Sequence, residues 1–123
     1  MRLTRERFHR LVTEALDELP PFLAAHMSNV DIVVEELPGD EVGGEFSGEV
    51  EALLGLYQGI PLTERDSQYF GVLPDRITLY KRNIERATRT EEEVREAVRR
   101  TVIHEIAHHF GIGDARLDEL GWS

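Results

Sequence analysis

The chain has 123 residues, of which 41% are hydrophobic and 31% are charged, and it contains no cysteine. This length predicts one domain, residues 1–123, and the composition is typical of a globular protein in water. The lack of cysteine excludes disulfides and thiolate metal ligands, so a bound metal must be held by nitrogen and oxygen. No apolar run approaches the roughly 20 residues of a membrane span, and the N-terminus lacks the apolar centre of a secretory signal. We therefore expect a cytoplasmic protein without a membrane role.

The net charge of −10 is concentrated in one part of the chain. Between residues 11 and 64 there are twelve Asp and Glu and no Lys or Arg, so this segment alone carries −12. An acidic half opposes contact with phosphate backbones, which excludes nucleic acid as a partner. The acidic segment either attracts a cationic substrate or only keeps the surface solvated.

The first element predicted is an amphipathic helix at 4–19, where apolar residues recur at helical spacing until Pro20-Pro21. Alternating apolar residues and flanking Gly or Pro predict three strands, at 29–38, 52–57 and 75–81. In the third strand, Ile77 and Leu79 are expected to face one way and the residues next to them the other. Two segments are predicted to be loops, at 38–51 and 61–75.

The last predicted element is a helix that begins after Thr90 and ends at Gly111. Thr90 is the expected N-cap, Glu93 completes a capping box, and Gly111 supplies the stop. In the first half of this helix the apolar residues form one stripe that faces the core. In the second half, apolar residues also lie on the side that is charged in the first half. We therefore expect the helix to begin at the surface and to end buried on nearly all sides, with His104, Glu105 and His108 inside the fold.

The spacing of these three residues points to metal chemistry. His104 and His108 are one turn apart on one face, so two imidazoles can converge on one ion. Glu105 lies about 60° round from His108, beside such an ion, where it can contact a bound water. The third ligand must come from beyond the helix, and Gly111 lets the chain turn so that Asp114 swings back. The alternatives for that ligand are Asp118 and Glu119.

The stretch HEIAHHFGIGD, residues 104–114, resembles the HExxHxxGxxD signature of zincin metallopeptidases whose third ligand is aspartate. The similarity is closest to a small bacterial family of minimal, single-domain zincin-like zinc metallopeptidases. It extends through NVDIVVEELP, LLGLYQGIPL, LPDRITLY and TVIHEIAHHFGI. The chain differs from the metzincins, which have a third histidine in place of Asp114 and a methionine turn after the site.

The resemblance implies an α+β fold, zincin-like, with an N-terminal helix, a small mixed β-sheet and a C-terminal active-site helix. It also implies that Zn²⁺ is held by His104, His108 and Asp114, and that Glu105 is the general base. On these grounds we expect a metallopeptidase that hydrolyses peptide bonds through a zinc-activated water.

The expected partner is a peptide or protein substrate, of cationic character if the acidic segment attracts it. We predict that the substrate lies along a strand edge at 76–80. Candidates for the oxyanion donor are Tyr80, His109 and Arg116, and His109 is otherwise expected to pack or to form hydrogen bonds rather than to bind metal. Two alternatives stay open: a zincin-fold module that binds zinc but has a binding or regulatory role, and a metal-free scaffold with buried histidines.

Overall fold

The computed structural model describes residues 1–25, 27, 30–39, 53–58, 75–109, 111 and 113–119, with Phe22, Asp114, Leu117 and Asp118 described by backbone only. The predicted loops at 38–51 and 61–75 lie almost wholly outside these residues. Within them the order is α1 (Arg5–Asp17), α2 (Pro21–Ala24), β1 (Val30–Glu35), β2 (Gly55–Gln58), β3 (Asp75–Tyr80), α4 (Lys81–Ala87), α5 (Glu91–His109) and α6 (Asp114–Glu119). This is the α+β class predicted from the sequence. No helix in the described ranges is long and apolar enough to cross a membrane.

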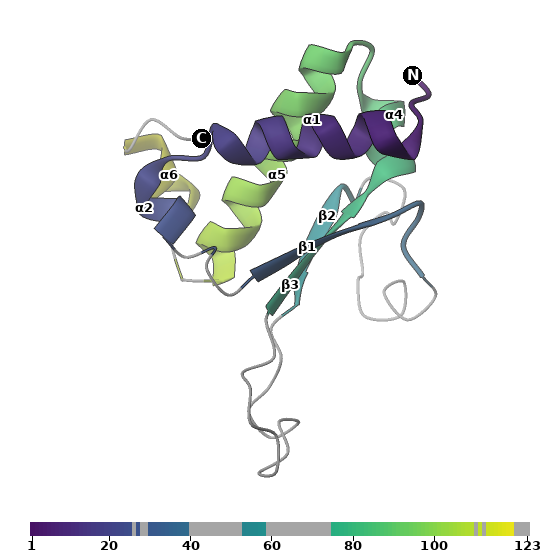
Figure 1. The fold of residues 1–123 in the computed structure, drawn as a ribbon. Coiled ribbons are helices and arrows are strands. Elements are labelled where there is room, and N and C mark those ends of the chain that lie inside the picture. The colour runs from purple at the N-terminus through teal and green to yellow at the C-terminus, as the bar shows by residue number, and fades with distance from the viewer. Residues whose placement is uncertain are drawn as a thin grey trace.

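The first helix, α1, forms where the apolar spacing predicts it. The hydroxyl oxygen of Thr4 accepts a hydrogen bond from the backbone N–H of Arg7 and so caps the helix. A short helix, α2, then begins at Pro21, a position where the missing N–H costs nothing. The buried side chains of α1 form one stripe, made of Phe8, Leu11, Val12 and Ala15. This stripe packs on α5, which α1 crosses in Figure 1.

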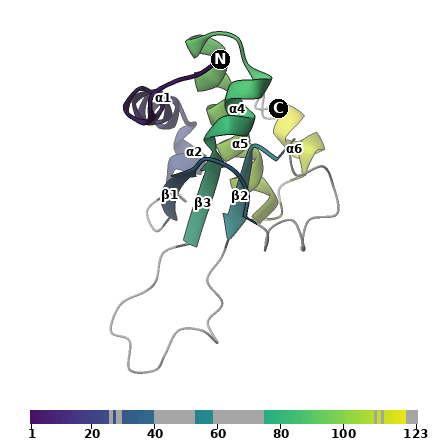
Figure 2. The same cartoon turned by 90° about the vertical axis from the view of Figure 1, so that its right-hand side faces the viewer.

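The sheet has three strands in the order β1, β3, β2. β1 is parallel to β3, with Val30 opposite Asp75, and β2 is antiparallel to β3, with Gly55 opposite Leu79. β3 is therefore the central strand, and all its side chains from Ile77 to Tyr80 are buried. The prediction that 76–80 offers an open edge is wrong, because β1 and β2 pair with both sides of this strand. The outer strands of the described sheet are β1 and β2 (Figure 2).

The helix α4 follows β3 directly and was not predicted. Its sequence KRNIERA has four charged residues, so it shows no apolar stripe. A buried ion pair holds it instead: Lys81 Nζ lies 2.9 Å from Glu85 Oε2, and both side chains are at most 5% exposed. The same Glu85 oxygen accepts a hydrogen bond of 2.7 Å from the backbone N–H of Leu3. This carboxylate thus joins α4 to the segment before α1.

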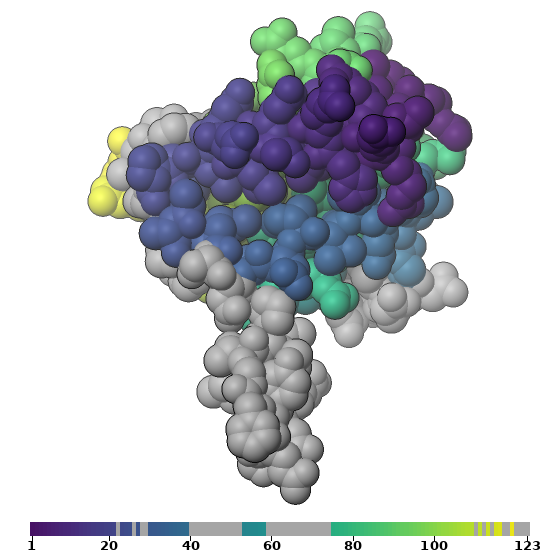
Figure 3. Space-filling model, in the orientation of Figure 1, coloured from purple at the N-terminus to yellow at the C-terminus, as the bar shows by residue number. Residues whose placement is uncertain are grey.

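The longest helix, α5, has the predicted ends. The Thr90 hydroxyl oxygen accepts from the backbone N–H of Glu93 at 3.1 Å and contacts the Glu93 carboxylate at 3.2 Å. At the other end Gly111 has a φ of 76°, and its N–H donates to the carbonyl of His108. Between these ends α5 packs on β2 and β3 on one side and on α1 on another. In the space-filling view α1 and β1 lie side by side on one face of the molecule (Figure 3).

Candidate metal and catalytic site

The last two turns of α5 carry the predicted site, but they are less buried than the sequence pattern indicates. His104 and Glu105 are half-buried, and His108 and His109 are exposed. The expectation that this segment is buried on nearly all sides is wrong. The sheet and α1 cover only part of the helix surface, and the buried side chains of α5 lie there: Val94, Val98, Val102, Ile103, Ile106 and Ala107.

Two neighbouring rows of less buried side chains also run along α5. Residues four apart lie on the same face of a helix, so Thr101, Glu105 and His109 form one row and His104 and His108 form the next. The first row faces β2, as the contacts below show. The second row is the histidine pair.

The histidine pair has the donor chemistry that zinc requires. The ring centroids of His104 and His108 lie 6.3 Å apart, and their planes differ by 22°. Two imidazoles that share a tetrahedral zinc at N–Zn distances of about 2.0–2.1 Å have centroids about 5 Å apart. The two rings are therefore slightly farther apart here than in a bound site, and their nitrogen donors suit a zinc ion.

The third predicted ligand, Asp114, is the first residue of α6, five positions after the last residue of α5. Its side chain lies outside the described part of the structure. Among the side chains that are described, no group of three His, Asp or Glu is placed to hold a metal ion. Of the alternative ligands, the Asp118 side chain is also outside the described part, and Glu119 pairs with Arg116 at 2.9 Å.

Glu105 is held by the backbone of β2. Its Oε1 accepts a hydrogen bond of 2.9 Å from the N–H of Tyr57. The carbonyl of Leu54 accepts from the N–H of Tyr80 in β3, so alternate residues of β2 turn their backbone groups to β3. Gly55 and Tyr57 consequently turn theirs to the outer edge of the sheet. Glu105 thus binds the outer edge of β2, beside the histidine pair.

The Tyr57 side chain connects β2, β3 and α5. Its ring stacks on His109, with centroids 4.0 Å apart and planes 18° apart, and its hydroxyl donates a hydrogen bond of 2.8 Å to Asp75. His109 Nε2 is 3.9 Å from the same Asp75 oxygen. Burial, the hydrogen bond to Asp75 and the negative charge of Asp75 raise the pKa of the Tyr57 hydroxyl. The hydroxyl group therefore stays protonated. The contacts of the Tyr57 side chain hold in place the strand segment that binds Glu105.

A glycine allows β2 to approach α5 this closely. A Cβ atom at Gly55 would lie 2.7 Å from the Thr101 methyl carbon and 3.1 Å from the carbonyl oxygen of Thr78. Gly55 and Tyr57 are two residues apart, so they face the same side of the strand, toward Thr101 and His109 respectively. The absent side chain at Gly55 brings the Tyr57 N–H within reach of Glu105.

The three oxyanion candidates lie in different places. Tyr80 is 2% exposed in the central strand, and Arg116 is on α6 in an ion pair with Glu119. Only His109 lies in the same row as Glu105, and it packs on Tyr57, as predicted for a residue that does not bind metal. Tyr57 and Asp75 were missed, because no local pattern reveals that a tyrosine of one strand meets the first residue of another.

The family model for zincin-like metallopeptidases matches residues 27–122, a stretch that includes the whole sheet, α5 and the motif at 104–114. A search of the curated proteins gave no match. The matched region also covers both strands that meet the Glu105 row. The chain therefore belongs to the zincin-like metallopeptidase family.

Proposed function

We propose that this protein is a zinc-dependent peptidase in which His104, His108 and Asp114 hold the metal ion and Glu105 is the general base. The observation that carries the proposal is the position of Glu105. Its carboxylate is half-buried, it is fixed by the Tyr57 N–H at 2.9 Å, and it lies in the row next to the histidine pair. Membership of the zincin-like metallopeptidase family supports the reaction class.

A zinc ion in this position supplies Lewis-acid activation of water and of the scissile carbonyl group. The chain contributes the proton acceptor. One Glu105 oxygen, Oε1, accepts the Tyr57 N–H. We assign to Oε2 the acceptance of a proton from water and its later transfer to the leaving amine. A carboxylate with one oxygen fixed presents the other in a constant direction, which favours this transfer.

We place the peptide along the outer edge of β2 rather than along β3. The backbone carbonyls of Gly55 and Tyr57 face that edge, so the N–H groups of an extended peptide can pair with them. The Glu105 row of α5 lies next to this strand. A peptide bound in this way would therefore pass directly over the general base and the histidine pair.

The experiment compares zinc content and peptide cleavage for a set of single variants. We expect the parent to bind one zinc ion and to cleave peptides from a diverse library. Glu105→Gln should keep the zinc and lose cleavage by about 10²–10⁴-fold, the usual contribution of a general base. His104→Ala and His108→Ala should lose the zinc. His9→Ala is the matched control, because His9 is exposed on α1, far along the sequence from the motif, and should change neither quantity.

Two results would overturn the proposal in different ways. A parent that binds zinc but cleaves no peptide would leave a zincin-fold binding module. A parent that binds no zinc would exclude both the peptidase and the module.

A further inference from the structure

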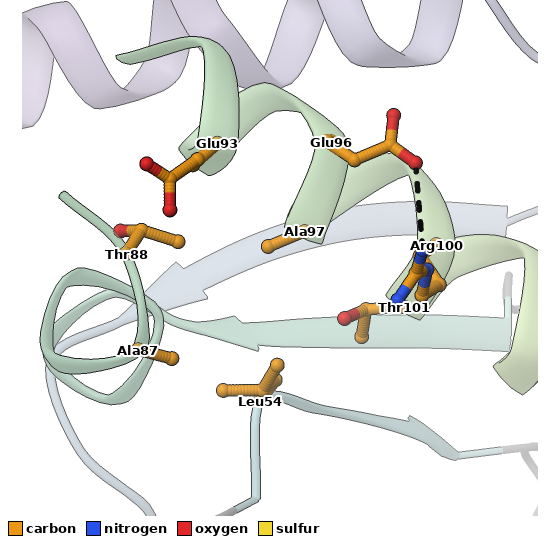
Figure 4. A pocket seen from close by; sticks show the side chains of 8 residues that line it. All are labelled: Leu54, Ala87, Thr88, Glu93, Glu96, Ala97, Arg100 and Thr101. Carbon is orange, nitrogen blue, oxygen red and sulfur yellow. Dashed lines mark ion pairs between the residues drawn. The ribbon is translucent and has the colours of Figure 1, made fainter. Parts of the chain in front are cut away.

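A pocket of about 280 Å³ lies along α5, on the N-terminal side of the candidate site. Figure 4 shows α5 on one side of it, Leu54 on the opposite side and the end of α4 at one end. Thr101, which lines the pocket, is one turn before Glu105 in the row that faces β2. The lining residues are Leu54, Ala87, Thr88, Glu93, Glu96, Ala97, Arg100 and Thr101.

We propose that this pocket binds a lysine or arginine side chain of the peptide substrate, with the aliphatic stem between Leu54 and Ala97 and the cationic end at Glu93. The inference rests on the proposed function, because it assumes a peptide on the outer edge of β2. It adds a substrate class and a position to that function.

The walls of the pocket suit an aliphatic stem. Leu54 and Ala97 face each other across the pocket, and Ala87 closes one end (Figure 4). Leu54 and Ala97 are only half-buried, so they have apolar surface that a ligand can cover. Long cationic side chains bury their methylene groups on such surface and keep the charged end in water.

The charges are unequal at the two ends of the pocket. At one end Glu96 is neutralised, because Arg99 binds it through two nitrogens at 3.1 and 2.5 Å and Arg100 lies 3.9 Å away. At the other end Glu93 contacts the Thr90 hydroxyl and forms no ion pair with a described residue. At the Glu93 end, no positive charge of the described residues neutralises the carboxylate in the lining.

The dipole of α5 does not cancel the attraction of the Glu93 end for a positive charge. The N-terminus of α5 carries a partial positive charge of about half a unit, which would oppose a cation. Its first turn contains Glu91, Glu92 and Glu93, of which only Glu91 is engaged by an arginine of the described part of the chain, Arg7. The full negative charge of Glu93 at the pocket therefore outweighs the half charge of the helix terminus.

The distance along α5 fixes where the cationic residue must stand in the substrate. The lining residues of α5 lie at 93–101 and the histidine pair at 104 and 108. At a rise of about 1.5 Å per residue, the middle of this lining, Ala97, is about 10–14 Å from His104 and the midpoint of the histidine pair along the helix. An extended peptide covers this distance in about three or four residues. We therefore expect the lysine or arginine three or four residues from the cleaved bond, on one side only.

The first test measures binding without any need for catalysis. N-acetyl-lysine-methylamide is titrated into the ¹⁵N-labelled protein, and we expect shifts of the amides of Ala97 and Thr101. The Glu93→Gln variant should bind this probe about two- to five-fold more weakly, as for an exposed ion pair. Glu92→Gln is the matched control, since it removes the same charge from an exposed side chain of the same turn that does not line the pocket.

The proposal is overturned if N-acetyl-norleucine-methylamide, which lacks the charge, binds equally well. It is also overturned if Glu92→Gln weakens binding as much as Glu93→Gln, or if the shifts map away from the pocket.

The second test uses cleavage of a peptide series in which one lysine is moved stepwise along an otherwise uncharged sequence. We expect a lysine three or four residues from the cleaved bond to raise kcat/KM in the parent, and Glu93→Gln to abolish that preference. If the peptides are cleaved without any preference for the position of the lysine, and the probe of the first test does not bind, the pocket proposal is refuted and the peptidase proposal stands. Probe binding at the pocket without any cleavage would refute the peptidase and leave the pocket.

Discussion

Replacing Gly55 by alanine is expected to move β2 away from α5 and to weaken the contact between Tyr57 and Glu105. The new methyl group would lie 2.7 Å from the Thr101 methyl carbon and 3.1 Å from the Thr78 carbonyl oxygen. Ordinary carbon contacts are about 3.5–4.0 Å, so the methyl overlap approaches 1 Å. Overpacking of this kind costs about 1–3 kcal/mol, and we expect about 2 kcal/mol of lost unfolding free energy.

A second substitution tests whether the Thr101 methyl group is the cause. Thr101→Ser removes that carbon, and by itself should cost at most about 0.8 kcal/mol, the value of one buried methylene. In the double variant with Gly55→Ala, the loss of unfolding free energy should be about 1 kcal/mol smaller than the sum of the losses in the two single variants. Urea unfolding followed by circular dichroism gives the free energies, and the chemical shift of the Tyr57 amide proton reports the bond to Glu105.

The matched control is Gly113→Ala. A Cβ there meets no atom of the described residues within 4 Å, and the residue does not have a positive φ. This variant should unfold within about 0.5 kcal/mol of the parent. Strict additivity of Gly55→Ala and Thr101→Ser, or an equal loss in Gly113→Ala, would refute the close approach of β2 to α5.

The remaining predictions concern two titratable groups. The fold raises the pKa of Tyr57 above its ordinary value of 10.0, so the stability that this proton contributes is complete below pH 10 and is lost as the pH rises further. The free energy of unfolding measured in urea should thus be larger for the parent than for Tyr57→Phe by a constant amount from pH 7 to 9, and this difference should shrink above pH 10. A difference that stays the same above pH 10 would contradict the raised pKa. Lys81→Met should cost about 3–5 kcal/mol, because it strands the buried Glu85 carboxylate. Adding Glu85→Gln should restore much of this loss in the same assay, and a double variant no more stable than the single one would show that the charge is not the cause.

The helices that were predicted correctly are those whose signals are local. Apolar spacing located α1, and the Thr90 cap with the Gly111 stop located α5. The helices α2, α4 and α6 were not predicted. Of these, α4 has no apolar stripe, and it is held by the Lys81–Glu85 pair, whose burial depends on the rest of the fold. Local periodicity carries no information about such a pair.

The order of the strands and the burial of the motif depend on distant segments. All three strands were found, but their pairing places β3 in the centre, which the sequence of β3 does not encode. The histidine pair was recognised by its spacing, whereas its exposure follows from how much of α5 the small sheet and α1 can cover. Tyr57 and Asp75 become neighbours only through the register of β2 and β3.

The central position of β3 also sets the order in which the sheet can assemble. Each residue of β1 pairs with the residue 45 positions later, as Val30 with Asp75, and β2 pairs with the same late strand. At translation rates of about 5–20 residues per second, β1 leaves the ribosome at least about 2 s before its partner. The two early strands are not neighbours in the sheet, so neither can pair with the other in its native arrangement. Synthesis of β3 is thus the step that commits the nascent chain to its sheet.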